Sequence, residues 1–390
     1  MSEPVNAVER PLFSRFNIVA GAIILVGLWL SYLRFSGGLG AVTNLDQNNA
    51  WGFWIGFDLL CGVALAAGGY TTAATVEIFG MKKFHAALRP ALLTGFLGYS
   101  MVVVALLYDV GRPWRLPYPF VISPGATSVL FEVGACVMLY LVVLFLEFSP
   151  MALEWLGEKK LRRVLVRLTL GLTIFGVVLS TLHQSSLGAL FLIVPSKLHP
   201  LWYSSYLPVF FFVSSIAAGL SMVIFEGTLA HRAFGDVMDD EHKRTANDVV
   251  LGFGKGAAFV LAAYFAIKVF GVALGDHWSL LGTNYGLWFL LEMIGFVLLP
   301  CFLYLVGVRD RNVKLIRWTA ALTVLGIVLN RLNVCLIAFN WQLPAAERYV
   351  PHWMEIGISV FVVTVGVTAY RFIVTRMPVL YEHPEFRESH

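Results

Sequence analysis

The sequence has few charged residues for its length. Charged residues make up 13% of the 390 positions, hydrophobic residues make up 58%, and the mean hydropathy is +0.76. This composition argues against any soluble domain, because a soluble core needs more polar surface to cover it. It predicts one polytopic membrane domain over residues 1–390, with an all-α integral membrane fold, because a helix satisfies its own backbone groups within lipid.

Cysteine and histidine are also scarce, which limits the possible cofactors. The four cysteines stand singly in separate apolar stretches, without the Cys-x-x-Cys spacing of iron–sulfur or c-type haem sites. Of the nine histidines, only His183 lies clearly inside an apolar stretch, whereas a b-type haem in a bundle usually needs two axial histidines. We expect no haem, no iron–sulfur cluster and no metal in this chain. Nucleotide-binding fingerprints are missing too, and no nucleic-acid partner is expected.

Long apolar stretches are what the sequence has in abundance. A run of about 20 apolar residues crosses the roughly 30 Å hydrocarbon core as a helix. The N-terminal segment contains Glu3 and Glu9 and leads into the first stretch without a small-residue cleavage site, so we expect no secretory signal there. The ten predicted helices are 16–35, 54–78, 88–110, 128–148, 164–183, 207–230, 249–275, 286–308, 314–337 and 352–374.

The basic residues predict the orientation of these helices. Most of the 28 lysines and arginines fall in the loops on one side, which is the side of both termini. The loops of the other side contain only Arg112, Arg115, Lys197 and Arg348. Because cytoplasmic loops carry an excess of Lys and Arg, both termini are predicted to be cytoplasmic.

Several charged residues lie inside the apolar stretches, where a charge costs at least about 2.5 kcal/mol on insertion scales. With the predicted orientation, five of them lie towards the outer face and form one expected cluster: Asp58, Asp109, Arg112, Glu132 and His183. Glu77, Glu147 and Glu226 lie towards the inner face. Structural roles stay open for several of these residues. Asp109 and Arg112 could form a helix-end ion pair, Asp58 could cap its helix, and Glu147 is expected to reach the inner surface.

The second half of the chain echoes the first at an offset of four helices. Residues 66–68 precede Glu77 as residues 217–219 precede Glu226, and both segments read Ala-Ala-Gly. An even offset preserves helix direction, so the pattern predicts a parallel repeat about the membrane normal. The expected arrangement is two four-helix bundles, with the first and tenth helices outside them.

Aromatic residues gather in three segments that are predicted to lie on the outer face. These segments are 51–54, 112–118 and 199–203. They are interpreted either as the rim of a pocket or docking surface, or as an interfacial aromatic belt.

At these residues the chain resembles the NrfD/PsrC-like integral membrane subunits, and more closely their HybB-type branch, which is related to the DsrP, HmcC and QrcD subunits. The resemblance covers the second to sixth helices and rests on length and hydropathy over the last four. Its motifs are WGFWIGFDLL (51–60), RPALL (89–93), DVGR (109–112), SVLFE (128–132), LHQSSLG (182–188), HPLW (199–202) and IFEG (224–227).

The resemblance implies a subunit of a respiratory complex in the cytoplasmic membrane of a bacterium or archaeon. Such a subunit exchanges electrons between menaquinone or another quinone and a periplasmic ferredoxin-like subunit with several iron–sulfur clusters, during anaerobic respiration. A multihaem cytochrome c, a hydrogenase or another redox enzyme would complete the complex. Both directions of electron flow remain open.

The same resemblance implies a haem-free quinone site near the outer face. His183 is the expected hydrogen-bond partner of the quinone, with Gln184 beside it. Proton acceptors are expected at Asp58, Asp109 and Glu132. The remaining expected contacts are listed by role: Arg112, Trp54 and Tyr118 at the quinone, and Glu77 and Glu226 on a proton route to the inner face.

Two other functions are compatible with the pattern. A proton-coupled transporter would also show ten helices, a weak repeat and intramembrane carboxylates. A passive membrane anchor is the third possibility, although it would leave the buried charges without a role.

Overall fold

The computed structural model describes residues 13–381, 383, 385 and 386. Within this range it is built of helices, and ten of them are long and apolar enough to cross a membrane. This confirms the predicted all-α class and a helix at each predicted span. Glu3, Glu9 and the segment around them lie outside the described residues, so the prediction about a secretory signal is not addressed.

Seven of the ten spans are single α-helices apart from short end turns. In chain order they are α1 (Arg15–Gly37), α4 (His85–Asp109), α6 (Val129–Leu156), α7 (Lys159–Ala189), α8 (Leu207–Phe234) and α9 (Asp240–Leu274), and the last span, α13 (Trp353–Arg376), is a further one.

The other three spans are composite helices that contain π-helical turns. The second span joins η2 (Trp54–Cys61), α2 (Gly62–Ala66), α3 (Gly68–Ala73) and η3 (Ala74–Ile78). The eighth joins α10 (Asn284–Leu290), η7 (Leu291–Leu298) and α11 (Leu299–Arg309), and the ninth joins α12 (Val313–Leu332) and η8 (Asn333–Ile337). Among the described residues the four π-helical segments are thus η2, η3, η7 and η8. Such segments are rare and often occur at functional sites.

Several helices extend beyond the predicted spans. Helix α9 has 35 residues and begins at Asp240, where Asp239 caps it by accepting a hydrogen bond from the backbone N–H of His242. Helix α7 has 31 residues and ends at Ala189. Hydropathy registers only the part of a helix that lies in hydrocarbon, whereas the backbone ladder continues into polar ends. The prediction that His183 closes its helix is therefore wrong, because His183 lies inside α7.

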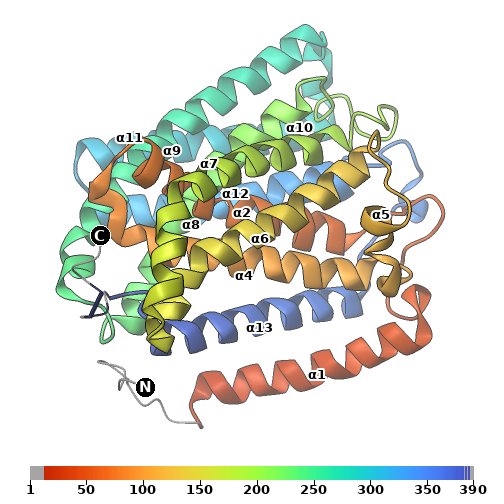
Figure 1. The fold of residues 1–390 in the computed structure, drawn as a ribbon. Coiled ribbons are helices and arrows are strands. Elements are labelled where there is room, and N and C mark those ends of the chain that lie inside the picture. Colours follow the sequence, from red (N-terminus) through yellow and green to blue (C-terminus); the bar gives the residue numbers. More distant parts are fainter. Residues whose placement is uncertain (1–12, 382, 384, 387–390) are drawn as a thin grey trace.

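The second span lies at the centre of the molecule and α1 lies at its edge. Within the most apolar part of each, 78% of the residues of the second span are buried, compared with 17% for α1. Helix α1 packs on α13, which in turn packs on α4, as Figure 1 shows along its lower edge. Helices α6 and α7 pack together on one side of the second span, and α8, α9, α11 and α12 pack together on the other. The grouping into two four-helix bundles stays a prediction.

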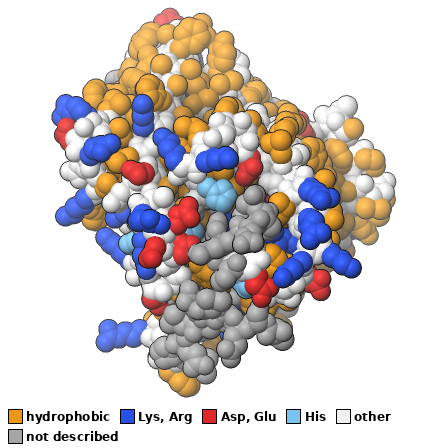
Figure 2. Space-filling model, turned by 60° about the vertical axis from the view of Figure 1, so that its left-hand side comes forward, with side chains coloured by type: hydrophobic (Ala, Val, Ile, Leu, Met, Phe, Trp, Pro, Cys, Tyr) orange, Lys and Arg blue, Asp and Glu red, His pale blue; other side chains and the backbone are white. Residues whose placement is uncertain are grey.

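The start of α1 and the end of α13 lie at the same end of the molecule (Figure 1). In Figure 2 this end comes forward, and Lys and Arg side chains are gathered over it. This arrangement agrees with the charge pattern that predicts cytoplasmic termini, and the orientation itself remains a prediction.

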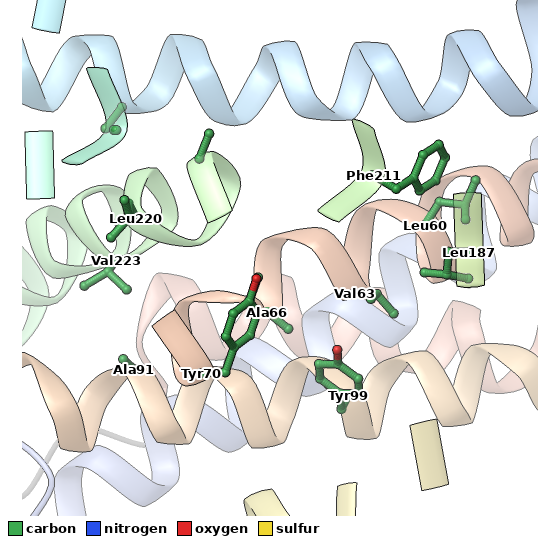
Figure 3. Packing of buried hydrophobic residues seen from close by; sticks show 14 of the residues in the cluster. Leu60, Val63, Ala66, Tyr70, Ala91, Tyr99, Leu187, Phe211, Leu220 and Val223 are labelled. Atoms are coloured by element: carbon green, nitrogen blue, oxygen red, sulfur yellow. The ribbon is translucent and has the colours of Figure 1, made fainter. Parts of the chain in front are cut away.

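The two Ala-Ala-Gly segments meet in the core, where the second span crosses α8. A Cβ atom placed on Gly219 would lie 2.7 Å from the carbonyl carbon of Ala67 and 2.8 Å from the nitrogen of Gly68. Only glycine allows the two backbones to approach this closely. Around this crossing, Val63, Ala66 and Tyr70 face α8 and α4 in the hydrophobic core (Figure 3).

Candidate functional site

A group of buried charges lies between the second span, α4, α1 and α13. Asp58 stands within the π-helical segment η2, and Asp109 is the last residue of α4. Arg34 comes from the last turn of α1 and Glu355 from the first turn of α13. Asp109 interacts electrostatically with Arg34 and Glu355, and Asp58 interacts with Asp109. We call Asp58, Asp109, Arg34 and Glu355 the acidic cluster.

Arg34 is fixed in place within the acidic cluster. Its side chain is 2% exposed, and its Nε donates to the carbonyl of Tyr108 at 2.7 Å. One of its terminal nitrogens donates to the carbonyl of Val110 at 2.9 Å. These carbonyls are at the end of α4, where a helix leaves acceptors unpaired and favours a positive charge. Arg34 therefore closes the end of α4 and places a permanent positive charge beside Asp109.

The carboxylates of the cluster differ in how many hydrogen bonds their oxygens accept. Glu355 is fully buried and accepts hydrogen bonds from the backbone N–H groups of Asn44 at 3.1 Å and His352 at 3.0 Å, and from the hydroxyl of Tyr349. Asp58 accepts from the hydroxyl of Ser359 at 2.5 Å. The buried Oδ1 of Asp109 has no hydrogen-bond partner among the described residues. Asp109 is thus the carboxylate with a free acceptor.

The structure brings only part of the expected outer cluster together. Asp58 and Asp109 interact, whereas Glu132 accepts a hydrogen bond from Ser186 at 2.5 Å on another side of the second span. Arg112 is exposed and forms no ion pair with Asp109 in the described part of the chain. The helix-end pair between these two residues is therefore absent, and Arg34 takes the position beside Asp109.

Two residues expected at the quinone have different surroundings. Trp54 is 2% exposed and donates through its indole N–H to the carbonyl of Glu355 at 3.2 Å, so it forms part of the wall of the acidic cluster. Tyr118 is 40% exposed, lies in the short helix α5 (Tyr118–Val121), and packs under Arg115 with 5.5 Å between the guanidinium and the ring centre. Tyr118 lies on the surface and not in the cluster.

His183 lies in a separate polar group between α4, α6 and α7. It is completely buried, and the centre of its ring is 5.4 Å from that of Tyr99, which in turn is 4.7 Å from that of Tyr140. Neither His183 nitrogen has a hydrogen-bond partner among the described residues, and the same is true of the hydroxyls of Tyr99, Tyr140 and Ser180. Gln184 donates to the carbonyl of Val63 at 3.1 Å, and its oxygen is unpaired.

The inner carboxylates fall into two groups. Glu147 is 9% exposed, accepts a hydrogen bond from Thr173 at 2.8 Å and interacts electrostatically with Glu77. The expectation that Glu147 reaches the inner surface is therefore wrong. Glu226 lies on α8 beside Thr94 and Tyr370, where its buried Oε1 has no hydrogen-bond partner among the described residues. Glu77 and Glu226 thus lie on different sides of the core.

A cavity of about 500 Å³ connects the surroundings of Asp58 with those of Glu226. Asp58 and Phe57 line one end, and Glu226, Tyr370 and Arg371 line the other. His183 and Glu132 do not line it. The acidic cluster therefore reaches an open space through Asp58, whereas His183 does not border this space.

One of the outer aromatic segments is buried. His199 is 3% exposed and its ring stacks on Tyr285, with 4.6 Å between the ring centres. Burial, together with nearby His277, lowers the pKa of His199 to about 4. Trp202 is fully buried as well, whereas Trp114 in the 112–118 segment is 70% exposed. Residues 199–202 therefore belong to the core and are neither a rim nor a belt.

The last four helices hold a buried polar network that the sequence analysis missed. Glu292, in the π-helical segment η7, accepts hydrogen bonds from Trp202 at 2.8 Å, Asn330 at 2.7 Å and Asn333 at 2.5 Å. Arg331 donates to Asn330 at 2.7 Å. The arginine within an apolar stretch was a visible signal. Arg34 lies within an apolar stretch in the same way. The helices of Arg331 and Arg34 carry none of the site residues expected from the sequence.

The histidines do not suit a haem held by two axial ligands. His183 stands among tyrosine, serine and glutamine side chains. In the described part of the chain no group of three or more His, Cys, Asp or Glu residues could hold a metal ion. The side chains around His183 are hydroxyl and amide groups and supply no second axial ligand.

Comparison with known proteins identifies the family. A family model described as "Polysulphide reductase, NrfD" matches residues 41–341. A chain from Nitratidesulfovibrio vulgaris is 65% identical over 98% of both chains. The probable Ni/Fe-hydrogenase 2 b-type cytochrome subunit of Escherichia coli is 32% identical over 97% of this chain and 96% of its own length. The integral membrane subunit of menaquinone reductase from N. vulgaris is 28% identical, covering 98% and 96%. This multi-pass membrane chain therefore belongs to the NrfD family.

Proposed function

We propose that this chain is the quinone-reactive membrane subunit of a respiratory complex, in which it exchanges electrons between the membrane quinone pool and an iron–sulfur subunit on the predicted outer side. The acidic cluster beside an open cavity carries this proposal. Membership of the NrfD family, and a relative named as a menaquinone reductase subunit, support it. A hydrogenase or another redox enzyme would complete the complex.

The acidic cluster has the groups that quinone chemistry requires. Oxidation of a quinol to a quinone releases two electrons and two protons, so the site needs proton acceptors near the ring oxygens. Asp109 has a free oxygen, and Asp58 has one hydrogen bond, from Ser359. Arg34 supplies a fixed positive charge that favours the ionised form of a neighbouring carboxylate. The electrons leave to the partner subunit, because the described residues include no His, Cys, Asp or Glu group suited to a redox metal.

A proton route through α6 and α7 is the second part of the proposal. Polar side chains on these helices follow one another along the bundle, from the exposed Glu132 to buried groups: Glu132 and Ser186, then His183, Ser180 and Tyr140, then Glu147 and Thr173 with Glu77 beside them. Glu132 and Glu147 are 15 positions apart on α6, or about 22 Å at 1.5 Å per residue. Buried polar atoms need partners, and water between these groups would supply them. We assign His183 to this route, because it does not border the open cavity.

The quinone proposal is tested by replacing Asp58 and Asp109 in the intact complex. Asp58→Asn and Asp109→Asn should each reduce quinone-linked electron transfer by roughly 100-fold, the usual contribution of a positioned acid or base. Asp310→Asn is the matched control, because Asp310 is an exposed carboxylate paired with Arg309. Complex assembly should be unchanged in all three. Parental turnover in both cluster variants would refute the site.

A further inference from the structure

The cavity beside the acidic cluster is a long apolar groove. Its walls come from α1, the second span, α4, α8 and α13, and consist mainly of aliphatic, small and aromatic side chains. Asp58, Glu226, Thr94, Tyr370 and Arg371 are its main polar lining residues. Val362 and Arg371 both line it and are nine positions apart on α13, so the groove is about 14 Å long at 1.5 Å per residue. It is therefore much longer than the ring of a quinone.

The groove opens sideways at the height of the membrane interior. Phe16, Leu229, Val363 and Val367 line it and are also partly exposed, by 37% to 49%. They come from α1, α8 and α13, and the two valines lie near the middle of α13. The opening thus faces the hydrocarbon of the bilayer, and a ligand can enter from the lipid phase.

The charges of the groove select against one class of lipid. A carboxylate lies at the Asp58 end and another at Glu226, whereas Arg371 is the cationic lining residue. A phosphate headgroup beside Asp58 would meet like charge in a site of low dielectric constant, which is unfavourable. An uncharged ring with O–H groups can instead donate to a carboxylate there.

We propose that this groove binds the prenyl chain of a quinone or quinol, with the ring directed towards Asp58, the member of the acidic cluster that lines the groove. This inference rests on the proposed quinone function and adds the position of the chain. The chain enters between α8 and α13 and covers the apolar walls. Because the chain comes from the lipid phase and not from water, the groove holds it by van der Waals contact with its walls, and each further isoprene unit adds contacts. Chain length then determines affinity, whereas the acidic cluster determines the chemistry.

The test is to block the groove with tryptophan at two partly exposed positions, which spares the folded core. Val363→Trp on α13 and Leu229→Trp on α8 place an indole in its mouth. Val360→Trp and Val209→Trp are matched controls, because these valines are 45% and 44% exposed on the same helices and do not line the groove. Each variant complex is assayed with a long-chain menaquinol and with duroquinol, which has no chain.

The groove variants should raise the KM for the long-chain menaquinol roughly tenfold, equivalent to about 1.4 kcal/mol, and leave the KM for duroquinol unchanged. The controls should match the parent with both substrates. Equal KM values for parent and groove variants with menaquinol would overturn the inference. A parent complex that neither oxidises these quinols nor reduces the corresponding quinones would refute the proposed function, not the groove.

Lipid extraction from the purified complexes tests the occupant without an activity assay. The parent should carry a prenylquinone that the groove variants lose and the controls retain. Groove variants that keep the quinone and lose a phospholipid instead would overturn the inference, because a phospholipid chain anchored at Arg371 would then fill the groove.

Discussion

The burial of His183 changes the role that we expect for this residue. It stands in the segment LHQSSLG, yet it is completely buried, its ring packs against Tyr99, and it does not line the groove. An imidazole can accept a proton on one nitrogen and release it from the other. The surroundings of His183 therefore favour a role in moving protons over a role in holding the quinone ring.

Replacement of His183 tests this role. His183→Ala should slow quinone-linked electron transfer by roughly 100-fold, because protons released by the quinol can no longer leave along α7. Binding of the iron–sulfur subunit should be unaffected. His231→Ala, at an exposed position on α8, serves as the control. Steady-state turnover and co-purification measure the two effects, and near-parental turnover would reduce His183 to a packing residue.

His199 predicts how stability depends on pH. Burial keeps its folded-state pKa at about 4, below the ordinary value of about 6.5. The neutral folded form is therefore fully favoured above pH 6.5. As the pH falls from about 6.5 towards 4, the unfolded chain binds a proton that the folded chain does not, and stability is lost.

The thermal midpoint of the purified protein, measured between pH 7.5 and 4.5, should show this loss. His199→Gln should flatten the part of the pH dependence that lies below about 6.5. An unchanged slope in the variant would mean that other groups cause the loss.

Which residues form the site could be predicted only in part. Asp58 and Asp109 were found because a carboxylate inside an apolar stretch is costly and visible in the sequence. Arg34, Glu355 and Ser359 were missed, since they join the cluster from helices that were placed outside the bundles. Their approach to Asp58 depends on how α1 and α13 pack, and the pattern of apolar residues does not encode that packing.

At the scale of elements, the ten helices could be predicted and their π-helical turns could not. Apolar length fixes how many spans there are, because each must cross the same hydrocarbon thickness. A π-helical turn adds one residue to the local repeat and leaves hydropathy unchanged. Asp58 and Glu292 both stand in such segments. The altered register aims these carboxylates in directions that an ideal helix would not give.

The crossing of the second span and α8 gives a prediction about packing. Gly219→Leu should destabilise the protein by roughly 1–3 kcal/mol, because the new side chain meets the backbone at Ala67 and Gly68. Gly227→Leu, on the same helix, is the matched control, since a Cβ there meets nothing within 4 Å. Thermal unfolding of both variants measures the effect, and equal midpoints would show that the two helices can separate without cost.

For the whole molecule, the separation of the two inner carboxylate groups decides how charge crosses the membrane. Glu147 and Glu77 continue the polar side chains of α6 and α7, whereas Glu226 borders the apolar groove. If protons follow α6 and α7 to the inner side while the electrons leave on the outer side, the reaction changes the membrane potential. If protons and electrons leave on the same side, the potential does not change.

Sealed vesicles containing the complex test this route. Glu147→Gln and Glu77→Gln should each lower the membrane potential formed per electron transferred, because an amide cannot pass on the proton that a carboxyl group carries. Glu347→Gln, at an exposed loop position, is the control. If Glu226→Gln lowers the potential and Glu147→Gln does not, protons pass along α8 and the proposed route is wrong.

The pairing of α1 with α13 has a consequence for biosynthesis. Arg34 is made early, whereas Glu355 and Ser359 emerge from the ribosome only after nearly all the other spans have been inserted. Until then Asp58 lacks its hydrogen-bond donor and the groove lacks one wall. A chain that stops before residue 353 can thus fill the membrane with nine helices and still contain no complete site. The acidic cluster and the groove can therefore form only after α13 has been inserted.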